Sequence, residues 1–270
     1  IFRNAALTNT IASLRRLRPL IGTDEVLARK DAARITDDFL RWLDRHGGAS
    51  AGAGGSGTGG RPFFAFLNYF DAHDPYLPPP EHIERVSGRV RRDALSPFRR
   101  IGPNGLHAAL GPEAAALERD AYDGAIAYID QELGRLFDDL ERRGVLDHTI
   151  VVITSDHGEE FGEHGLFLHG HTLYLPALHV PLIIAAPRRG VPAGLRIAEP
   201  VSLRGLAATL AELAELRPAE PFPGTSFALH WRNALGNDAG VAVAPEPILS
   251  EVQQGVRIPD RYPSAHGDMA

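Results

Sequence analysis

Cysteine is absent from this chain of 270 residues, so it contains no disulfide framework, although the redox compartment stays open. No stretch reaches the roughly 18 consecutive apolar residues that a membrane span requires, and no signal peptide is visible. Basic residues are not in excess either. The formal net charge of -6 leaves no surplus of Lys and Arg to neutralise phosphates, so we expect no nucleic-acid partner.

The composition that remains is typical of a globular α/β chain. Hydrophobic residues make up 44% and charged residues 23% of the sequence, which is ordinary for a chain with a sizeable core. The residue pattern predicts helix over 1–46, and the Gly/Ala/Ser-rich composition of 47–60 predicts a flexible loop. Beyond this loop the pattern predicts strands and helices in alternation: strand 62–69, helix 113–143, strand 149–154, strand 180–186 and helix 203–216.

The predicted strand 149–154 ends abruptly in Asp-His-Gly. Its run of Ile, Val and Thr lacks alternation, which is typical of a strand covered on both faces in a parallel sheet. Ligand sites in such sheets lie just beyond the carboxyl ends of the strands. Asp156 and His157 occupy that position, and a carboxylate oxygen and an imidazole nitrogen are suitable ligands for a divalent ion, while Gly158 lets the backbone turn. Alone, the tripeptide also suits a solvated strand-end turn.

Several further motifs follow in a fixed order. Upstream, an apolar stretch leads into His73-Asp74-Pro75, and downstream lie His-Gly-His-Thr-Leu-Tyr at 169–174 and Val-Pro-Leu-Ile-Ile at 180–184. Together, over roughly 63–252, these motifs resemble the sulfatase family of the alkaline phosphatase superfamily, specifically the carboxyl-terminal portion of its catalytic domain. The resemblance implies an alkaline-phosphatase-like, doubly wound α/β fold. Its sheet would be mostly parallel with helices on both faces, followed by a short carboxyl-terminal subdomain.

The resemblance also implies roles for four residues. Asp156 and His157 would be metal ligands, for Ca²⁺ in a sulfatase and for Mn²⁺ or Zn²⁺ in a phosphoesterase. His73 would be catalytic, because an imidazole near the leaving oxygen can donate a proton near neutral pH; a turn or cap role is its structural alternative. His171 would also contact the substrate, but it replaces a family lysine with a titratable donor, so sulfate and phosphate esters both stay open.

Other polar residues near Asp-His-Gly are open to two interpretations. His169 and His171 are two residues apart, so both could point inward and bind a second metal. Loop histidines also serve as hydrogen-bonded structure. We expect the acidic residues of this segment to be solvated loop carboxylates and the histidine among them to stabilise the loop by hydrogen bonding: Glu159, Glu160, Glu163 and His164.

The family's paired aspartates and nucleophile are not found where the resemblance would place them. Asp37 and Asp38 precede His73 but lie in an amphipathic helical pattern, which predicts solvated helix-face carboxylates. Formylglycine cannot arise within a chain that lacks cysteine. The segment 96–99, Ser-Pro-Phe-Arg, follows His73 and has its proline directly after the serine, so we expect an ordinary turn. A carboxyl-terminal fragment, inactive by itself, is therefore expected.

The function that the resemblance implies is metal-dependent hydrolysis of an anionic sulfate ester by the full-length protein, through in-line displacement. One alternative is a phosphodiesterase, phosphonate hydrolase or phosphoethanolamine-type transferase of the same superfamily. Another is a catalytically inactive binding or structural remnant. Location stays open between periplasmic, extracellular and membrane-tethered, and the oligomeric state is open too. The expected domains are 1–46, 47–60, 61–240 and 241–270.

Overall fold

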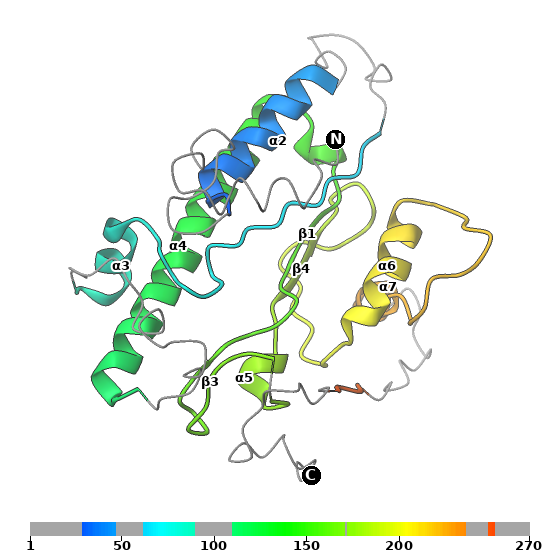
Figure 1. Ribbon diagram of the computed structural model, residues 1–270. Helices are drawn as coiled ribbons and strands as arrows, with labels where there is room; N and C mark the ends of the chain where they lie inside the picture. The colour runs from blue at the N-terminus through cyan, green and yellow to red at the C-terminus, as the bar shows by residue number, and fades with distance from the viewer. Residues whose placement is uncertain (1–28, 47–61, 90–109, 171, 236–247, 252–270) are drawn as a thin grey trace, which may run out of the picture. The chain divides into compact units, whose positions relative to one another are not determined.

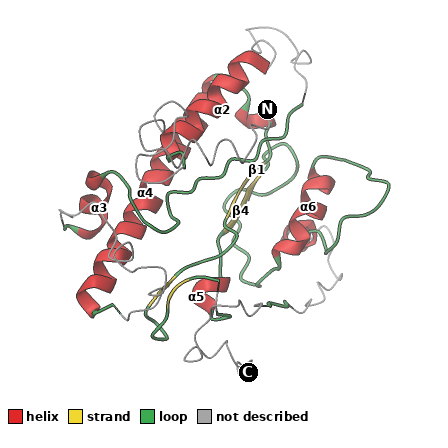
Figure 2. Cartoon of the chain, viewed as in Figure 1, coloured by secondary structure: helices red, strands yellow, loops and turns green. Residues whose placement is uncertain are grey.

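A computed structural model describes residues 29–46, 62–89, 110–170, 172–235 and 248–251. The chain divides into two compact units. Figures 1 and 2 show its helices and strands. The first unit comprises residues up to Gly144 together with Phe161–Phe167, and the second comprises the remainder from Val145 onward. The expected domain boundaries lie at the ends of, or inside, stretches outside the described residues, so they stay predictions.

The described part of the first unit contains three helices. Helix α2 (Ala32–His46) buries Ala32, Thr36, Phe39 and Leu43, a spacing that puts them on one face. Helices α2 and α3 (Pro80–Ser87) both pack on the long helix α4 (Pro112–Arg142), as Figure 1 shows. The helix predicted at 113–143 is therefore confirmed, and α2 confirms the described part of the predicted helical segment 1–46.

A glycine permits the close approach of α3 to α4. A Cβ atom at Gly124 of α4 would lie 2.9 Å from the Ile83 side chain and 3.0 Å from the Ile83 backbone nitrogen. Ile83 belongs to a buried apolar cluster with Tyr76, Ala121 and Phe161. The segment that leads into α3 is thus tied to α4 by tight packing.

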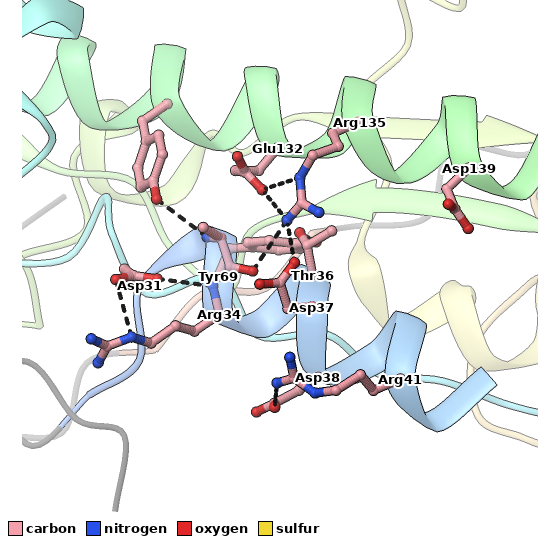
Figure 3. Close-up of polar contacts among 12 residues, drawn as sticks. Asp31, Arg34, Thr36, Asp37, Asp38, Arg41, Tyr69, Glu132, Arg135 and Asp139 are labelled. Carbon is pink, nitrogen blue, oxygen red and sulfur yellow. Dashed lines mark hydrogen bonds and ion pairs between the residues drawn. The ribbon is translucent and has the colours of Figure 1, made fainter. Parts of the chain in front are cut away.

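Polar contacts join α2 to α4 and are drawn in Figure 3. The Arg135 guanidinium of α4 lies 2.8 Å from the Asp37 carboxylate of α2 and 2.7 Å from Glu132, and it donates to the Ala33 carbonyl at 3.2 Å. Asp38 pairs with lysine and arginine side chains on the same stretch of chain. Both aspartates lie on a helix face, as predicted, and take part in ion pairs there.

The strand predicted at 62–69 is not present as a strand. Residues 62–70 form no helix or strand, and the sheets of the described residues do not include them. Neighbouring residues of this segment still differ in burial. Phe63 packs against the Phe39 and Trp42 rings of α2 at 6.0 and 5.8 Å between centroids, whereas Phe64 is 81% exposed. The prediction was wrong because an apolar stretch of strand length does not specify a pairing partner.

The second unit contains the strand pair that precedes and follows the Asp-His-Gly segment. Strand β1 (Val151–Thr154) pairs with β4 (Leu182–Ala185) in antiparallel register, Val151 opposite Ala185, and Figure 2 shows the two strands side by side. The expected strands are confirmed, but the expected parallel arrangement is wrong for this pair. Burial on both faces is wrong too, since Ile183 is 56% exposed.

The connection between β1 and β4 explains their antiparallel pairing. It holds the short pair β2 (Glu160–Phe161) and β3 (Phe167–Leu168) and the four-residue helix α5 (Leu175–Leu178). A parallel pair needs a crossover that carries the chain back to the same end of the sheet, usually along a helix. Within the described residues of this connection, α5 is the sole helix, so the chain returns along the opposite direction.

The core of the second unit lies around the elements after β4. The predicted helix 203–216 is confirmed as η4 (Leu203–Gly205) followed by α6 (Leu206–Leu213), and α7 (Ala228–Ala234) follows. Residues 248–251 form no regular element. None of the helices in the described part of the chain has both the length and the apolar character needed to cross a membrane. The core side chains are Ala186, Leu213, Phe227, Ala228 and Trp231.

Candidate metal-binding and catalytic residues

The Asp-His-Gly segment follows directly on β1 in the second unit. The Asp156 side chain is 90% exposed, and its Oδ1 accepts a hydrogen bond from the His157 backbone nitrogen at 3.1 Å. His157 Nε2 lies 3.8 Å from the same Oδ1. His157 Nδ1 lies 2.8 Å from the Gly158 carbonyl, which only accepts, so in the neutral ring Nδ1 carries the hydrogen and Nε2 keeps its lone pair.

Gly158 is needed for a reason that differs from the one predicted. Its backbone is not in the left-handed region. Instead, its nitrogen donates to the Ala177 carbonyl at 2.7 Å, and the next nitrogen, that of Glu159, donates to the Pro176 carbonyl at 2.9 Å. A Cβ atom at Gly158 would lie 2.0 Å from that Pro176 oxygen. The glycine therefore allows a close contact between the segment and the backbone of α5. It is not required for an unusual turn conformation.

A buried carboxylate fixes a second imidazole beside His157. His169 Nδ1 lies 2.9 Å from Glu159 Oε1, and the Glu159 side chain is only 3% exposed. The His169 and His157 rings stack at 3.8 Å between centroids with a 24° interplanar angle. Because the carboxylate accepts from Nδ1, Nε2 carries the lone pair of the neutral His169 ring and is its candidate ligand atom. Sequence reasoning considered His169 beside His171 and missed this pairing with Glu159.

The acidic residues of this segment divide into two kinds. The expectation of solvated carboxylates is wrong for Glu159 and Glu160, which are both buried. Glu160 accepts a hydrogen bond from the Thr172 hydroxyl at 3.1 Å, which ties it to the residues before α5. Glu163 and His164 are exposed as expected. Within the first unit, Glu163 accepts from the Phe161 backbone nitrogen at 2.7 Å and stabilises the hairpin tip.

His73 belongs to the first unit, where it occupies a turn before α3. Its imidazole stacks on the Phe70 ring at 4.3 Å between centroids, and its Nδ1 lies 2.8 Å from the Asp74 carbonyl. The Asp74–Pro75 peptide bond of this turn is cis. His73 is thus an ordered, half-buried imidazole. Its Nδ1 faces an oxygen acceptor, as do the Nδ1 atoms of His157 and His169 in the second unit.

Two of the predicted segments lie outside the described residues. His171, the second expected catalytic residue, is one of them, and the segment 96–99 is the other. Asp37 and Asp38, in contrast, are described and lie on α2. Asp38 is partly buried, which acts to raise its pKa, but hydrogen bonds from Lys30 and Arg41 hold that pKa below its usual value. Its charge is therefore used in an ion-paired helix face.

The second unit offers donors that fit a divalent ion. Asp156 Oδ1 and His157 Nε2 are 3.8 Å apart, and metal–ligand bonds of about 2.0–2.6 Å allow one ion to touch both. The candidate ligand nitrogens of His157 and His169 lie within 4.8 Å of each other. An imidazole with its other nitrogen held by a carboxylate or carbonyl is the usual arrangement of metal-binding histidines.

The comparison with protein families decides the relationship of the chain. The family model described as Sulfatase matches residues 12–216. This chain belongs to the sulfatase family. The family resemblance carried by the ordered motifs is thereby confirmed, and so is membership of the alkaline phosphatase superfamily.

Individual relatives extend this assignment. The chain is similar to the choline-sulfatase of Rhizobium meliloti, at 30% identity over 211 residues, which is 71% of this chain and 38% of that protein. It is similar to the multifunctional alkaline phosphatase superfamily protein PehA of Trinickia caryophylli, at 31% identity over 152 residues, 47% of this chain and 29% of that protein. The chain thus spans well under half of these relatives.

Solved structures bear on the fold. The phosphonate monoester hydrolase of Agrobacterium radiobacter matches with a TM-score of 0.56 at 24% identity, covering 73% of this chain and 41% of that one. This likeness confirms an alkaline-phosphatase-like α/β fold in this member of the sulfatase family. At this identity it shows the fold alone.

Proposed function

We propose that the sulfatase-family protein containing this chain is a metal-dependent hydrolase of sulfate esters. The observation that carries the proposal is the group formed by Asp156, His157 and His169 after β1, with Glu159 buried behind it. A solvated strand-end turn needs neither a buried carboxylate nor two stacked imidazoles. Family membership supports ester hydrolysis as the use of this group.

The residues take separate roles in this proposal. Asp156 and His157 hold the cation, with His169 as a further nitrogen donor. A bound divalent cation supplies Lewis-acid polarisation of an ester oxygen. His73 donates a proton to the leaving oxygen through Nε2 when its ring is protonated, since Nδ1 is engaged with the Asp74 carbonyl. His171 contacts the anionic group.

A second function is favoured by the nature of the donors. Ca²⁺ prefers oxygen ligands, whereas imidazole nitrogens suit Zn²⁺ and comparable transition metals. The nitrogen-rich pair His157 and His169 therefore favours Zn²⁺, one of the two ions expected for a phosphoesterase, over the Ca²⁺ expected for a sulfatase. The phosphonate monoester hydrolase fold neighbour is consistent with this alternative. Hydrolysis of a phosphodiester or phosphonate ester by the same group is our second candidate.

Metal and ester preference test both candidates in the full-length protein. The protein is stripped with a chelator, reloaded with Ca²⁺, Mn²⁺ or Zn²⁺, and assayed on the p-nitrophenyl esters of sulfate, phosphate and phenylphosphonate and on the bis-ester of phosphate. Sulfate ester turnover restored by Ca²⁺ supports the first candidate, and phosphorus ester turnover restored by Mn²⁺ or Zn²⁺ supports the second. A protein that binds metal but cleaves none of these esters would support the binding or structural remnant instead.

Asp156→Ala should abolish metal binding and turnover together, with a loss of turnover on the order of 10³-fold or more, because a bound cation contributes several kcal/mol to the transition state. Metal content by mass spectrometry and kcat/KM are the measurements. Asp147→Ala is the matched control, since that carboxylate is exposed in the same unit and lies 4.0 Å from Arg188. Full activity in Asp156→Ala would refute the ligand assignment.

His171→Lys asks which ester the protein prefers. A lysine restores the fixed positive charge that family members use, so the ratio of sulfate to phosphate monoester turnover should rise. The measurement is that ratio of kcat/KM values under one metal. An unchanged ratio would show that His171 does not set the preference.

A further inference from the structure

The turn that carries His73 is held by an arginine more than forty residues upstream. Arg29 donates from Nη1 to the Phe70 carbonyl at 3.1 Å and to the His73 carbonyl at 2.9 Å, and from Nη2 to the Pro75 carbonyl at 2.6 Å. Its guanidinium carbon also lies 5.5 Å from the centroid of the Phe70 ring. One planar fork thus fixes three carbonyls on both sides of His73.

The same contacts define the environment of the imidazole. The Phe70 ring that contacts Arg29 is the ring on which His73 stacks, with a 17° interplanar angle. The His73 backbone nitrogen donates to the Phe70 carbonyl at 3.2 Å, and that carbonyl also accepts from Arg29. Since Arg29 fixes the backbone on each side and the ring beneath, its removal frees the plane of the imidazole.

Helix α2 gives Arg29 a fixed base. Arg29 precedes α2 by three positions, and the Ala32 nitrogen at the helix start donates to the Asp71 carboxylate at 3.2 Å. A second contact therefore joins the helix start to the turn. Further along, the Arg135 side chain ties α2 to α4 by donating to the Ala33 carbonyl (Figure 3). The turn is thus connected through α2 to the longest helix of the first unit.

We propose that Arg29 is a positioning residue that orients the His73 imidazole for proton donation to the leaving group. This inference rests on the proposed function, because His73 is the catalytic residue through which Arg29 acts. Arg29 holds Nδ1 against the Asp74 carbonyl by fixing the backbone around it, and so directs Nε2 outward as the reacting nitrogen. The planar geometry of the guanidinium is required for these contacts, and a positive charge alone does not replace it.

The kinetic test compares Arg29→Lys and Arg29→Ala in the full-length, metal-loaded protein. Arg29→Lys keeps the charge but loses the fork, and we expect kcat to fall about 10- to 100-fold with KM little changed, since misplacement of a catalytic group costs rate more than binding. The loss should be larger for an alkyl ester than for a p-nitrophenyl ester, which leaves without protonation. Arg29→Ala should behave alike.

Two comparisons separate positioning from a general structural role. In a double-mutant cycle, Arg29→Lys should cost little further in a His73→Ala background, because the group it positions is gone. Arg34→Ala is the matched control: this arginine lies on α2 and pairs with Asp31 at 3.6 Å, and it takes no part in the contacts of the turn described above. Losses that add in the cycle, or that are equal for both esters, would overturn the proposal.

A measurement without turnover keeps this inference distinct from the proposed function. The ¹⁵N chemical shifts of His73 report its tautomer, and we expect the neutral ring of the wild type to carry its hydrogen on Nδ1. In Arg29→Lys the ring should lose this single tautomer and its cross-relaxation with Phe70. If no ester is cleaved but the tautomer changes, the proposed function fails and the positioning by Arg29 stands. An unchanged tautomer in a folded Arg29→Lys variant overturns the positioning itself.

Discussion

Two histidine-bearing turns among the described residues, those of His73 and His169, are held by opposite charges. In the first unit, the turn around His73 is fixed by the Arg29 cation, and its imidazole meets a neutral carbonyl. In the second unit, His169 is fixed by the Glu159 carboxylate. A carboxylate behind an imidazole favours a cation on its far nitrogen, whereas an arginine beside a turn favours an anion nearby. The contrast fits a metal-binding role for one turn and a substrate-facing role for the other.

The comparison extends to buried carboxylates, because one lies near His73 in the first unit and one contacts His169 in the second. Glu159 accepts from the His169 ring, and its charge has a partner that can be positive. Asp71, two residues before His73, accepts from the Ala32 nitrogen, while its Oδ2 is buried with no hydrogen-bond partner among the described residues. Burial raises the pKa of Asp71 to about 6, against the lowering effects of the Ala32 hydrogen bond and the Arg29 charge.

The largest effect is expected where the backbone of the second unit is crowded. Gly158→Ala places a Cβ atom 2.0 Å from the Pro176 oxygen, so the segment must move away from α5 and lose two backbone hydrogen bonds. We expect a loss of several kcal/mol in the free energy of unfolding of the second unit. The fluorescence of Trp231, made the single tryptophan by Trp42→Phe, reports unfolding of that unit in urea.

A glycine of the first unit serves as the matched control. Gly134 lies inside α4 with no atom near the position of its absent Cβ, so Gly134→Ala should stabilise that helix by about 0.5–1 kcal/mol. If both alanine variants behaved alike, the close approach at Gly158 would not be what fixes the Asp-His-Gly segment, and the comparison of the two turns would lose its structural basis.

The sequence predicted local elements better than their partners. The apolar spacing and the stop signal at Gly144 predicted α4 almost to its ends, because helix signals are contained in neighbouring residues. The strands 149–154 and 180–186 were also found. Their antiparallel pairing and the absence of a ladder at 62–69 were not, since both depend on hydrogen bonds between distant segments.

The sequence indicated the residues of the candidate site in the same uneven way. Asp156 and His157 were singled out because they follow a strand and match a family motif, and their role as metal ligands stays a prediction. The pairing of Glu159 with His169, ten residues apart, was missed because no periodic spacing marks a contact made across a loop. Glycine and glutamate in a loop suggested solvated turns, and burial of Glu159 and Glu160 by the chain around them overrode that suggestion. Arg29 likewise offered no local signal of its contacts with the His73 turn.

Asp71→Asn tests whether the charge of the buried Asp71 carboxylate lowers the free energy of unfolding. Because the pKa of Asp71 in the folded protein, about 6, is above the usual aspartate value of 3.8, the folded state binds more protons between these values. The wild type therefore loses stability as pH rises through this window, by up to about 3 kcal/mol. Asp71→Asn removes the charge, so the variant should be more stable than the wild type at pH 8, and this gain should vanish near pH 4.

Far-ultraviolet circular dichroism follows this prediction, since α2 and α4 supply much of the helix. Urea unfolding at pH 4, 6 and 8 gives the difference between variant and wild type at each pH. Asp147→Asn is the control, because its exposed carboxylate is solvated in the folded and unfolded states alike. A difference that stays constant with pH would mean that the Asp71 charge is not destabilising, and the two carboxylates would then be equivalent.

Glu159→Gln tests the buried carboxylate beside His169 in the second unit. We expect its negative charge to favour metal binding, whereas the charge of Asp71 destabilises the fold. An amide can still accept from His169 Nδ1, but it no longer compensates the positive charge of a cation bound to the imidazole. Metal affinity should therefore fall about 10- to 100-fold, which is a loss of about 1.4–2.8 kcal/mol in binding free energy. Isothermal titration of the stripped protein with Zn²⁺ or Mn²⁺ measures this directly. Glu163→Gln, on an exposed carboxylate of the same loop that pairs with Arg119 at 3.2 Å, should leave the affinity unchanged. Equal losses in both variants would indicate a general effect of loop charge, and the specific role of the buried Glu159 carboxylate would be refuted.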